Sequence, residues 1–261
     1  MTIGRMVVGT DGSDSAWRAV AHAVRLACRT GAEVLVAHAF ASPGGGREVE
    51  AEPGRDVGAS VLRDVTAEFG GRASLRCLLR EGDPTEQLID LAREEDADLI
   101  VVGNRGMGRR ALLGAVPSKV AHRAPCSVLI AHTAGGDHGE PYRRIVIGTD
   151  GSPTATRAVG EGLDLARMVG AEVLVVHAGD PARGAEVLER TLRDVTVDEP
   201  PETRTASGEP AGALIEVARE EDADLIVVGN RGMTGARRFL TSVPSRVAHH
   251  APCHVLLVKT T

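Results

Sequence analysis

The sequence contains very few aromatic residues, which make up only 2% of its 261 positions. Proteins that bind single-stranded nucleic acids stack the bases on aromatic side chains, and proteins that bind duplexes present a positive surface to the phosphates. The formal net charge of −6 at pH 7 provides no such surface. The composition therefore argues against nucleic acid as a partner.

Cysteine pairs and long apolar segments are also missing. The four cysteines, at positions 28, 77, 126 and 253, form no C-x-x-C motif. We expect each of them in a helix or strand of a reduced, cytoplasmic protein. Met1–Thr10 has one arginine and a short apolar run that ends in a turn, which is too little for a signal peptide or a membrane span. No membrane partner is expected.

The most informative feature that is present is a repeat. Ala92–Met107, AREEDADLIVVGNRGM, recurs letter for letter 126 residues later at Ala218–Met233. Each copy reads as the end of a helix, a buried four-residue strand and a glycine loop, G-N-R-G. In a parallel α/β sheet such a loop lies at the carboxyl edge, where backbone N–H groups can face a ligand. The functional site is therefore expected at this edge.

Strands and helices are predicted to alternate along each half of the chain. Ser13 is a good N-cap for the first helix, and Asp83-Pro84-Thr85-Glu86 has the pattern of a capping box. The alternation predicts a parallel, doubly wound α/β sheet. The predicted domains are residues 1–132 and 143–261, joined by a linker at 133–142. In the first half the expected strands are Arg5–Gly9, Glu33–His38, Leu75–Leu79, Leu99–Val102 and Cys126–Ile130.

The offset between the two halves changes along the chain. The T-D-G-S segments are 139 residues apart, the R-D-V-T segments 130 and the long repeats 126. The second half is therefore predicted to lack about nine residues in the loop after its second strand and about four more near its third, because such loops tolerate deletions. The longer loop of the first half, Ser42–Asp56, is expected to be mobile.

Four motifs occur twice in the same order: V-G-T-D-G-S, E-V-L-V-x-H-A, D-A-D-L-I-V-V-G-N-R-G-M and V-P-S-x-V-A-H-x-A-P-C-x-V-L. Together they resemble the universal stress protein family in a tandem form. The resemblance implies two flavodoxin-like (adenine nucleotide alpha hydrolase-like) domains, each with a five-stranded parallel sheet of order 3-2-1-4-5. It also implies pairing of the domains within the chain through their fifth strands, Cys126–His132 and Cys253–Lys259, with a homodimer as a further possibility.

Many members of that family bind ATP through G-x2-G-x9-G-[ST], with an aspartate after the first strand near the phosphates or their metal. Here Gly103 and Gly106 match the first glycine pair, but Gly114-Ala115 follows after seven residues. In the second half Thr241-Ser242 follows after eight. Each loop is shorter than the family's and lacks one member of the final pair. Nucleotide binding and a purely structural glycine turn therefore both remain open.

The resemblance implies that an adenine nucleotide, ATP first, lies over these loops with Mg²⁺. Asp11 and Asp150 could hold the metal through water, or each could form an Asx-turn. In the first domain the candidate residues are Gly9, Thr10, Asp11, Ala39, Val102, Gly103, Arg105, Gly106, Gly114, Ala115 and Val116. In the second they are Gly148, Thr149, Asp150, Ala178, Val228, Gly229, Arg231, Gly232, Thr241, Ser242 and Val243.

The expected function is binding in a stress response, without catalytic residues. A P-loop is excluded because Gly103–Gly108 is followed by two arginines rather than by Lys and Ser or Thr. Slow ATP hydrolysis, a cyclic nucleotide in the same pocket and a scaffold without any small ligand remain alternatives. The Cβ of Thr241 could block close approach of a phosphate, whereas Gly114 could not. The first domain is therefore expected to bind ATP–Mg²⁺ more tightly than the second.

Overall fold

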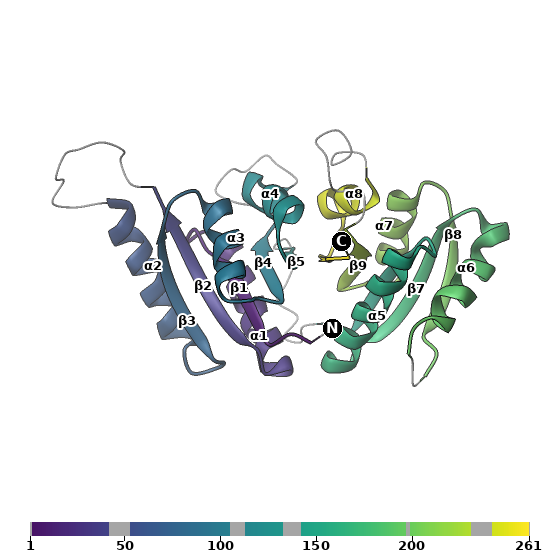
Figure 1. Cartoon of the computed structure of the whole chain (residues 1–261), viewed down its shortest axis with the longest axis horizontal. Helices are drawn as coiled ribbons and strands as arrows, with labels where there is room; N and C mark the ends of the chain where they lie inside the picture. Colours follow the sequence, from purple (N-terminus) through teal and green to yellow (C-terminus); the bar gives the residue numbers. More distant parts are fainter. Residues whose placement is uncertain are drawn as a thin grey trace. The chain divides into compact units, whose positions relative to one another are not determined.

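A computed structural model describes residues 2–41, 53–104, 113–132, 142–196, 199–230 and 242–260. The chain divides into two compact units, Ile3–Ala134 and Gly135–Thr261. Figure 1 labels most of their elements. Residues 133–141 of the predicted linker and residues 42–52 of the predicted mobile loop lie outside the described residues, so both predictions stay open there.

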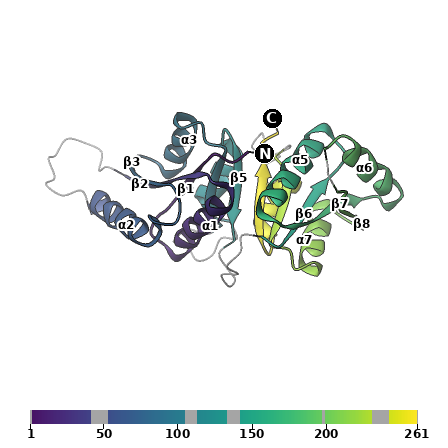
Figure 2. The same ribbon diagram turned by 90° about the horizontal axis from the view of Figure 1, so that it is seen from below.

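The first unit is a doubly wound parallel α/β domain. Its strands are β1 (Arg5–Gly9), β2 (Glu33–Phe40), β3 (Leu75–Glu81), β4 (Leu99–Gly103) and β5 (Ser127–Ala131). They lie in the order β3-β2-β1-β4-β5, and all neighbouring pairs are parallel. Its helices are α1 (Asp14–Thr30), α2 (Pro53–Phe69), α3 (Pro84–Glu94) and α4 (Ala115–Arg123). Helices α1 and α2 cover one face of the sheet and α3 covers the other (Figure 2), where α4 packs against α3.

The second unit repeats this architecture. Its strands are β6 (Arg144–Thr149), β7 (Glu172–Gly179), β8 (Glu202–Ser207), β9 (Leu225–Gly229) and β10 (His254–Val258). Their order is β8-β7-β6-β9-β10, again parallel. Its helices are α5 (Pro153–Val169), α6 (Pro181–Arg193), α7 (Pro210–Glu220) and α8 (Val243–His250). The predicted fold class and strand order are thus confirmed in both halves.

Local signals set the helix starts. The Ser13 hydroxyl accepts the Ala16 N–H at 3.3 Å, and the Asp83 carboxylate accepts those of Thr85 and Glu86 at 2.9 and 3.2 Å. Both N-caps are therefore as predicted. A capping box also predicts a bond from the Asp83 N–H to the Glu86 carboxylate. This part of the prediction is wrong, because the Glu86 carboxylate instead forms an ion pair with Arg123 of α4, with Nη2 2.8 Å from Oε2. This pair joins α3 to α4.

The core of each unit consists of aliphatic side chains on both faces of the central strands. Val7 and Ile100 of the first unit and Val146 and Ile226 of the second are fully buried. None of the four cysteines forms a disulfide, and Cys126 and Cys253 immediately precede β5 and β10 rather than lying inside them. Within the described part of the chain, no helix combines the length and hydropathy needed to cross a bilayer.

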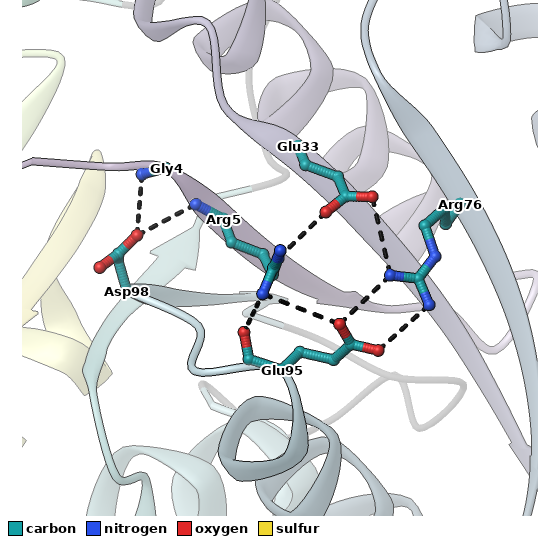
Figure 3. Close-up of polar contacts among 6 residues, drawn as sticks. All are labelled: Gly4, Arg5, Glu33, Arg76, Glu95 and Asp98. Carbon is teal, nitrogen blue, oxygen red and sulfur yellow. Dashed lines mark hydrogen bonds and ion pairs between the residues drawn. The ribbon is translucent and has the colours of Figure 1, made fainter.

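Charged side chains close the amino edge of the first sheet (Figure 3). Arg5 Nε lies 3.0 Å from Glu33 Oε2, while Arg76 lies 3.1 Å from Glu95 and 3.7 Å from Glu33. The Asp98 carboxylate accepts the backbone N–H groups of Gly4 and Arg5 at 2.8 and 3.0 Å. The start of β1 is therefore tied to β2, β3 and the segment that enters β4.

The second unit has the same arrangement at its amino edge. Arg144, with a side chain only 15% exposed, contacts Glu202 at 2.5 Å, Glu221 at 2.7 Å and Glu172 at 3.5 Å. Asp224 accepts the backbone N–H groups of Arg143 and Arg144, as Asp98 does in the first unit. One guanidinium contacts three carboxylates, so the network fixes the starts of the strands. The carboxyl edge, at the opposite end of the sheet, remains available for a site.

The packing of α2 and α6 corrects the alignment of the two halves. A Cβ on Gly58 would meet Leu79 at 2.6 Å, and one on Gly184 would meet Thr205 at 2.3 Å. Leu79 and Thr205 are the register partners of His38 and His177, respectively. The offset is therefore already 126 in this helix, and the R-D-V-T match at 130 is incidental. The predicted second deletion near the third strand is wrong, since the whole change from 139 to 126 falls between the second strand and the next helix.

Candidate functional site

The carboxyl edge of the second sheet contains a cavity of about 250 Å³. It lies where β6, β7 and β9 end and where three helices begin. Its predicted lining residues are Gly148, Thr149, Asp150, Ala178, Val228, Gly229 and Val243. Six further lining residues were missed by the sequence analysis: Ser152, Thr154, Ala155, Pro210, Leu214 and Pro244. The structure thus brings seven of the candidate residues of the second domain together around one cavity, whereas Ser242, which is also described, does not line it.

Three helix N-termini converge on this cavity. Helix α5 contributes its first turn, α7 contributes Pro210 and α8 contributes Val243 and Pro244, the first residues of those helices. The first N–H groups of a helix have no intrahelical acceptor and carry a positive partial charge. The dipoles of these three ends favour an anionic ligand in the cavity, although Pro210 and Pro244 themselves have no N–H group to donate.

The caps of these helices are satisfied by the protein itself. Ser152 accepts the Ala155 N–H at 3.3 Å, and Ser242 accepts the Ser245 N–H at 3.4 Å. Glu209 caps α7 by accepting the Gly212 N–H at 3.0 Å. Its carboxylate lies 2.7 Å from Arg246 of α8, which offsets its negative charge beside the cavity.

One wall of the cavity is apolar. It is formed by side chains of β7, β9, α7 and α8, whereas the turn after β6 and the start of α5 supply hydroxyl and carboxylate groups. The apolar residues are Ala178, Pro210, Leu214, Val228, Val243 and Pro244. This division suits a ligand with a flat apolar part and a polar or charged part.

The glycines that end β4 and β9 are in different surroundings, although they occupy equivalent positions. A Cβ on Gly103, in the first unit, would lie 2.8 Å from Ser15 Oγ and 3.0 Å from the Ser15 carbonyl oxygen. Packing against α1 therefore requires glycine there. At Gly229 the nearest atom to an added Cβ would be the Thr154 carbonyl oxygen, at 3.4 Å, which is an ordinary contact. Packing does not require glycine at that position, and its bare backbone faces the cavity.

The aspartates after β1 and β6 form Asx-turns. Asp150 Oδ1 accepts the Ser152 N–H at 2.9 Å, and Asp11 Oδ1 accepts the N–H and hydroxyl of Ser13 at 3.0 and 2.5 Å. The described residues contain no group of three His, Cys, Asp or Glu side chains that could hold a metal ion. A single carboxylate beside the cavity still fits Mg²⁺ held mainly by water and by ligand phosphates.

The first unit places its candidate residues at the equivalent edge. Gly9 ends β1, Ala39 is the penultimate residue of β2, and Val102 and Gly103 end β4. Thr10 and Asp11 follow β1, and Ala115 and Val116 begin α4. Gly114 is the N-cap of α4, without a side-chain capping bond, and its N–H donates to the Asn104 carbonyl at 2.9 Å. Arg105, Gly106, Arg231, Gly232 and Thr241 lie outside the described residues.

The asparagine of the exact repeat has a structural function that sequence reasoning missed. Asn230 Oδ1 accepts the N–H and hydroxyl of Thr260, both at 3.0 Å, while its own N–H donates to the Val258 carbonyl. These bonds fasten the chain after β10 to the start of the glycine loop. The asparagine in both copies of G-N-R-G was the signal that could have identified it.

A histidine lies beside each Asx-turn. His177 Nδ1 is 3.1 Å from the Thr149 carbonyl oxygen, whereas His38 Nδ1 has no hydrogen-bond partner among the described residues. Burial lowers the pKa of His38, although the Asp11 carboxylate and the Thr10 backbone act in the opposite direction. His38 is therefore neutral at neutral pH.

The fold and the site define a doubly wound parallel α/β protein, duplicated in tandem, with a cavity at the carboxyl edge of a sheet. The chain belongs to the universal stress protein family, whose sequence model matches residues 2–132, 141–196 and 183–259. The two matches in the second half overlap across α6, the helix that follows the shortened loop.

Similar proteins include both tandem and shorter forms. A universal stress protein of Mycolicibacterium smegmatis is 30% identical and covers 97% of this chain and 96% of its own. A universal stress protein of Mycobacterium tuberculosis is 36% identical over 49% of this chain and 95% of its own. The crystal structure of a universal stress protein from Archaeoglobus fulgidus covers 98% of this chain and 96% of its own, with a TM-score of 0.78 and 21% identity.

Proposed function

We propose that the cavity of the second domain binds an adenine nucleotide, with ATP as the first candidate. The observation that carries the proposal is the convergence of three helix N-termini on a cavity with one apolar wall. An adenine ring is flat and largely apolar, and a nucleotide phosphate is anionic. The two parts of the ligand thus match the two parts of the cavity.

The dimensions favour partial enclosure of the nucleotide. The cavity measures about 250 Å³, near the lower end of the range of roughly 300–1,000 Å³ for small-molecule pockets. The base and ribose would occupy it, and the phosphates would lie at its open side over the bare backbone of Gly229. Asp150 would hold Mg²⁺ through water, and the metal would neutralise phosphate charge.

The proposed activity is binding without turnover. Asp150 is the only ionisable side chain among the described lining residues, and its Oδ1 already accepts a hydrogen bond within the turn. General acid–base or nucleophilic catalysis needs an activated group within reach of the reacting atom. The described lining supplies no such pair, which supports a binding function.

Titration calorimetry of the full chain with ATP and Mg²⁺ tests the proposal. ADP, AMP, cyclic AMP and adenosine titrated in parallel would define which phosphates contribute. Gly229→Val should weaken binding at the second domain, because its Cβ would lie 3.4 Å from the Thr154 carbonyl oxygen and its methyl groups would crowd this side of the cavity. Gly71→Val is the matched control, since an added Cβ there meets nothing within 4 Å.

Three results would revise the proposal. No heat with any adenine compound would favour a scaffold without a small ligand. Tighter binding of cyclic AMP than of ATP would change the ligand. Equal affinity of Gly229→Val and the unmutated protein would move the site away from this cavity.

We also propose that β5 and β10 pair within the chain and that the protein acts in the cytoplasm. Both strands are wholly apolar from their second residue onward, and an unpaired apolar edge promotes aggregation. The tandem family matches support intrachain pairing. Light scattering at several concentrations would test it, and a dimer at all of them would favour pairing between chains instead.

A further inference from the structure

Helix α6 packs directly against the turn that borders the cavity of the second domain. This turn, Thr149–Ser152, supplies three lining residues, and Gly151 at its centre has a left-handed φ of 73°. A Cβ on Gly151 would lie 2.8 Å from Val187 of α6. Whatever fixes Gly151 therefore also fixes Asp150 and Ser152 on either side of it.

A chain of hydrogen bonds with a defined direction connects the turn to α6. The Thr191 hydroxyl donates to the Val187 carbonyl at 2.8 Å, and this uses its only proton. In the 3.2 Å contact between the Thr149 and Thr191 hydroxyls, Thr149 must then be the donor. Thr149 Oγ1 in turn accepts the Gly151 N–H at 3.1 Å. The turn is thus linked to a helix carbonyl through two buried hydroxyls.

The preceding residue of α6 holds the other polar group of Gly151. Arg190 Nη2 donates to the Gly151 carbonyl at 3.3 Å. Both backbone polar groups of Gly151 are therefore bonded, one through Thr149 and one directly to Arg190. Such second-layer contacts hold a site in its binding geometry before the ligand arrives.

The first domain lacks both contacts. At the offset of 126 residues that the helix packing establishes, Val65 stands at the position of Thr191 and Asp64 at that of Arg190. Thr10 still accepts the Gly12 N–H, at 3.3 Å, but Val65 has no hydroxyl to continue the chain. A carboxylate cannot donate to the Gly12 carbonyl. Within the described residues, the equivalent turn therefore lacks the two bonds that tie the second turn to its helix, although the Ser13 hydroxyl adds one bond inside the turn.

We infer that Thr191 is a positioning residue for the site of the second domain, and that this domain is consequently the tighter nucleotide site. The inference rests on the proposed function. It reverses the ranking expected from the glycine loops, because the described contacts order the second turn more completely than the first. Thr191 acts through Thr149 and Gly151 and does not line the cavity.

Thr191→Val in the full chain tests the inference, since it reproduces the valine that the first domain tolerates. Thr191→Ser keeps the hydroxyl, and Arg190→Gln changes an exposed side chain with little risk to folding. Thr66→Val is the matched control, because Thr66 of α2 also donates to a carbonyl four residues earlier, that of Leu62 at 2.8 Å. The measurements are ATP–Mg²⁺ affinity by calorimetry and hydrogen exchange of the Gly151 amide without ligand.

Thr191→Val should weaken the tighter site about three- to ten-fold, the size expected for one net hydrogen bond, and should speed exchange of the Gly151 amide. Arg190→Gln should weaken it about two- to three-fold by the same reasoning. Thr191→Ser and Thr66→Val should stay close to the unmutated protein.

Unchanged affinity and exchange in Thr191→Val would overturn the inference and leave the proposed function standing. If the unmutated protein binds no ATP, the proposed function fails and the affinity ranking fails with it. Amide exchange then decides by itself whether Thr191 positions the turn.

Discussion

Substituting alanine for the two equivalent glycines at the strand ends should give opposite results, although both lie in identical sequence. In Gly103→Ala the new Cβ would lie 2.8 Å from Ser15 Oγ and 3.0 Å from the Ser15 carbonyl oxygen. The hydroxyl can rotate away, but the carbonyl cannot, so the start of α1 must shift by several tenths of an ångström. In Gly229→Ala no atom would come closer than 3.4 Å.

The magnitudes follow from these contacts. Overpacking of this kind costs about 1–3 kcal/mol, and replacing glycine by alanine returns about 0.4–1 kcal/mol by restricting the unfolded chain. Gly103→Ala should therefore lower the free energy of unfolding of the first domain by about 1–2 kcal/mol. Gly229→Ala should raise that of the second domain by a few tenths of a kcal/mol.

The single tryptophan makes the assay specific for one domain. Trp17 lies in α1, two residues after Ser15, with its ring centroid 5.3 Å from that of Phe69. Urea unfolding followed by Trp17 fluorescence should thus show a lower midpoint for Gly103→Ala and no change for Gly229→Ala. An unchanged midpoint in Gly103→Ala, or equal losses in both variants by circular dichroism, would refute the packing argument.

Three further predictions concern pH, thiol reactivity and the charged network. Because burial lowers the pKa of His38, the unfolded chain binds more protons below its unfolded pKa of about 6.5. First-domain stability should therefore fall as the pH decreases below that value, until the pKa of His38 in the folded state is passed. His38→Gln should flatten this pH dependence when unfolding is followed by Trp17 fluorescence. An identical pH profile in the variant and the unmutated protein would contradict the prediction. Burial raises the pKa of Cys253 to about 12, whereas Cys28 is exposed. Iodoacetamide at pH 8 should therefore label Cys28 first, as detected by mass spectrometry. Early labelling of Cys253 would show that the native fold does not protect it. Arg144→Gln removes the cation shared by Glu202 and Glu221, although Arg204 still pairs with Glu221 at 3.3 Å. It should lower second-domain stability by about 1–3 kcal/mol, while the exposed Arg219→Gln should change it by less than about 0.5 kcal/mol. Equal effects of the two variants on chemical unfolding would argue against a special role for the network.

The fold could be predicted because most strands are short apolar runs between clear turn signals; the polar edge strand β8, ETRTAS, is an exception. Ser13 and Asp83 also marked their helices correctly. The start of α2 at Pro53 could not be located from the sequence, since residues 42–52 provide no N-cap pattern. The deletion was wrongly split between two loops because the identical R-D-V-T segments were aligned with each other. The packing of Gly58 and Gly184, which gives the correct alignment, cannot be read from the sequence.

The site was predictable only where its residues lie in the repeated motifs. Gly148, Asp150 and Gly229 belong to those motifs and do line the cavity. Leu214 comes from a helix whose sequence resembles any amphipathic helix, and only the topology brings it to this edge. Pro244 lies in the repeated V-P-S motif and was missed although its neighbour Val243 was named. Thr191 was invisible for a further reason: its importance depends on which hydroxyl donates, and that follows from hydrogen-bond geometry.

The ion network at the amino edge has a consequence for how the two halves have diverged. The connections that enter the strands, where Arg5, Arg144 and their carboxylates lie, keep the same length in both halves when equivalent residues are compared. The offset between equivalent residues changes only in connections that leave the strands: from 139 to 126 between the second strand and the next helix, and from 126 to 127 before the last helix. Stability and ligand contact therefore occupy opposite ends of the same sheet, so one end can accumulate insertions and deletions while the other preserves folding. A chain divided in this way offers protein engineers a loop edge that can be rebuilt in one domain with the other as an internal reference.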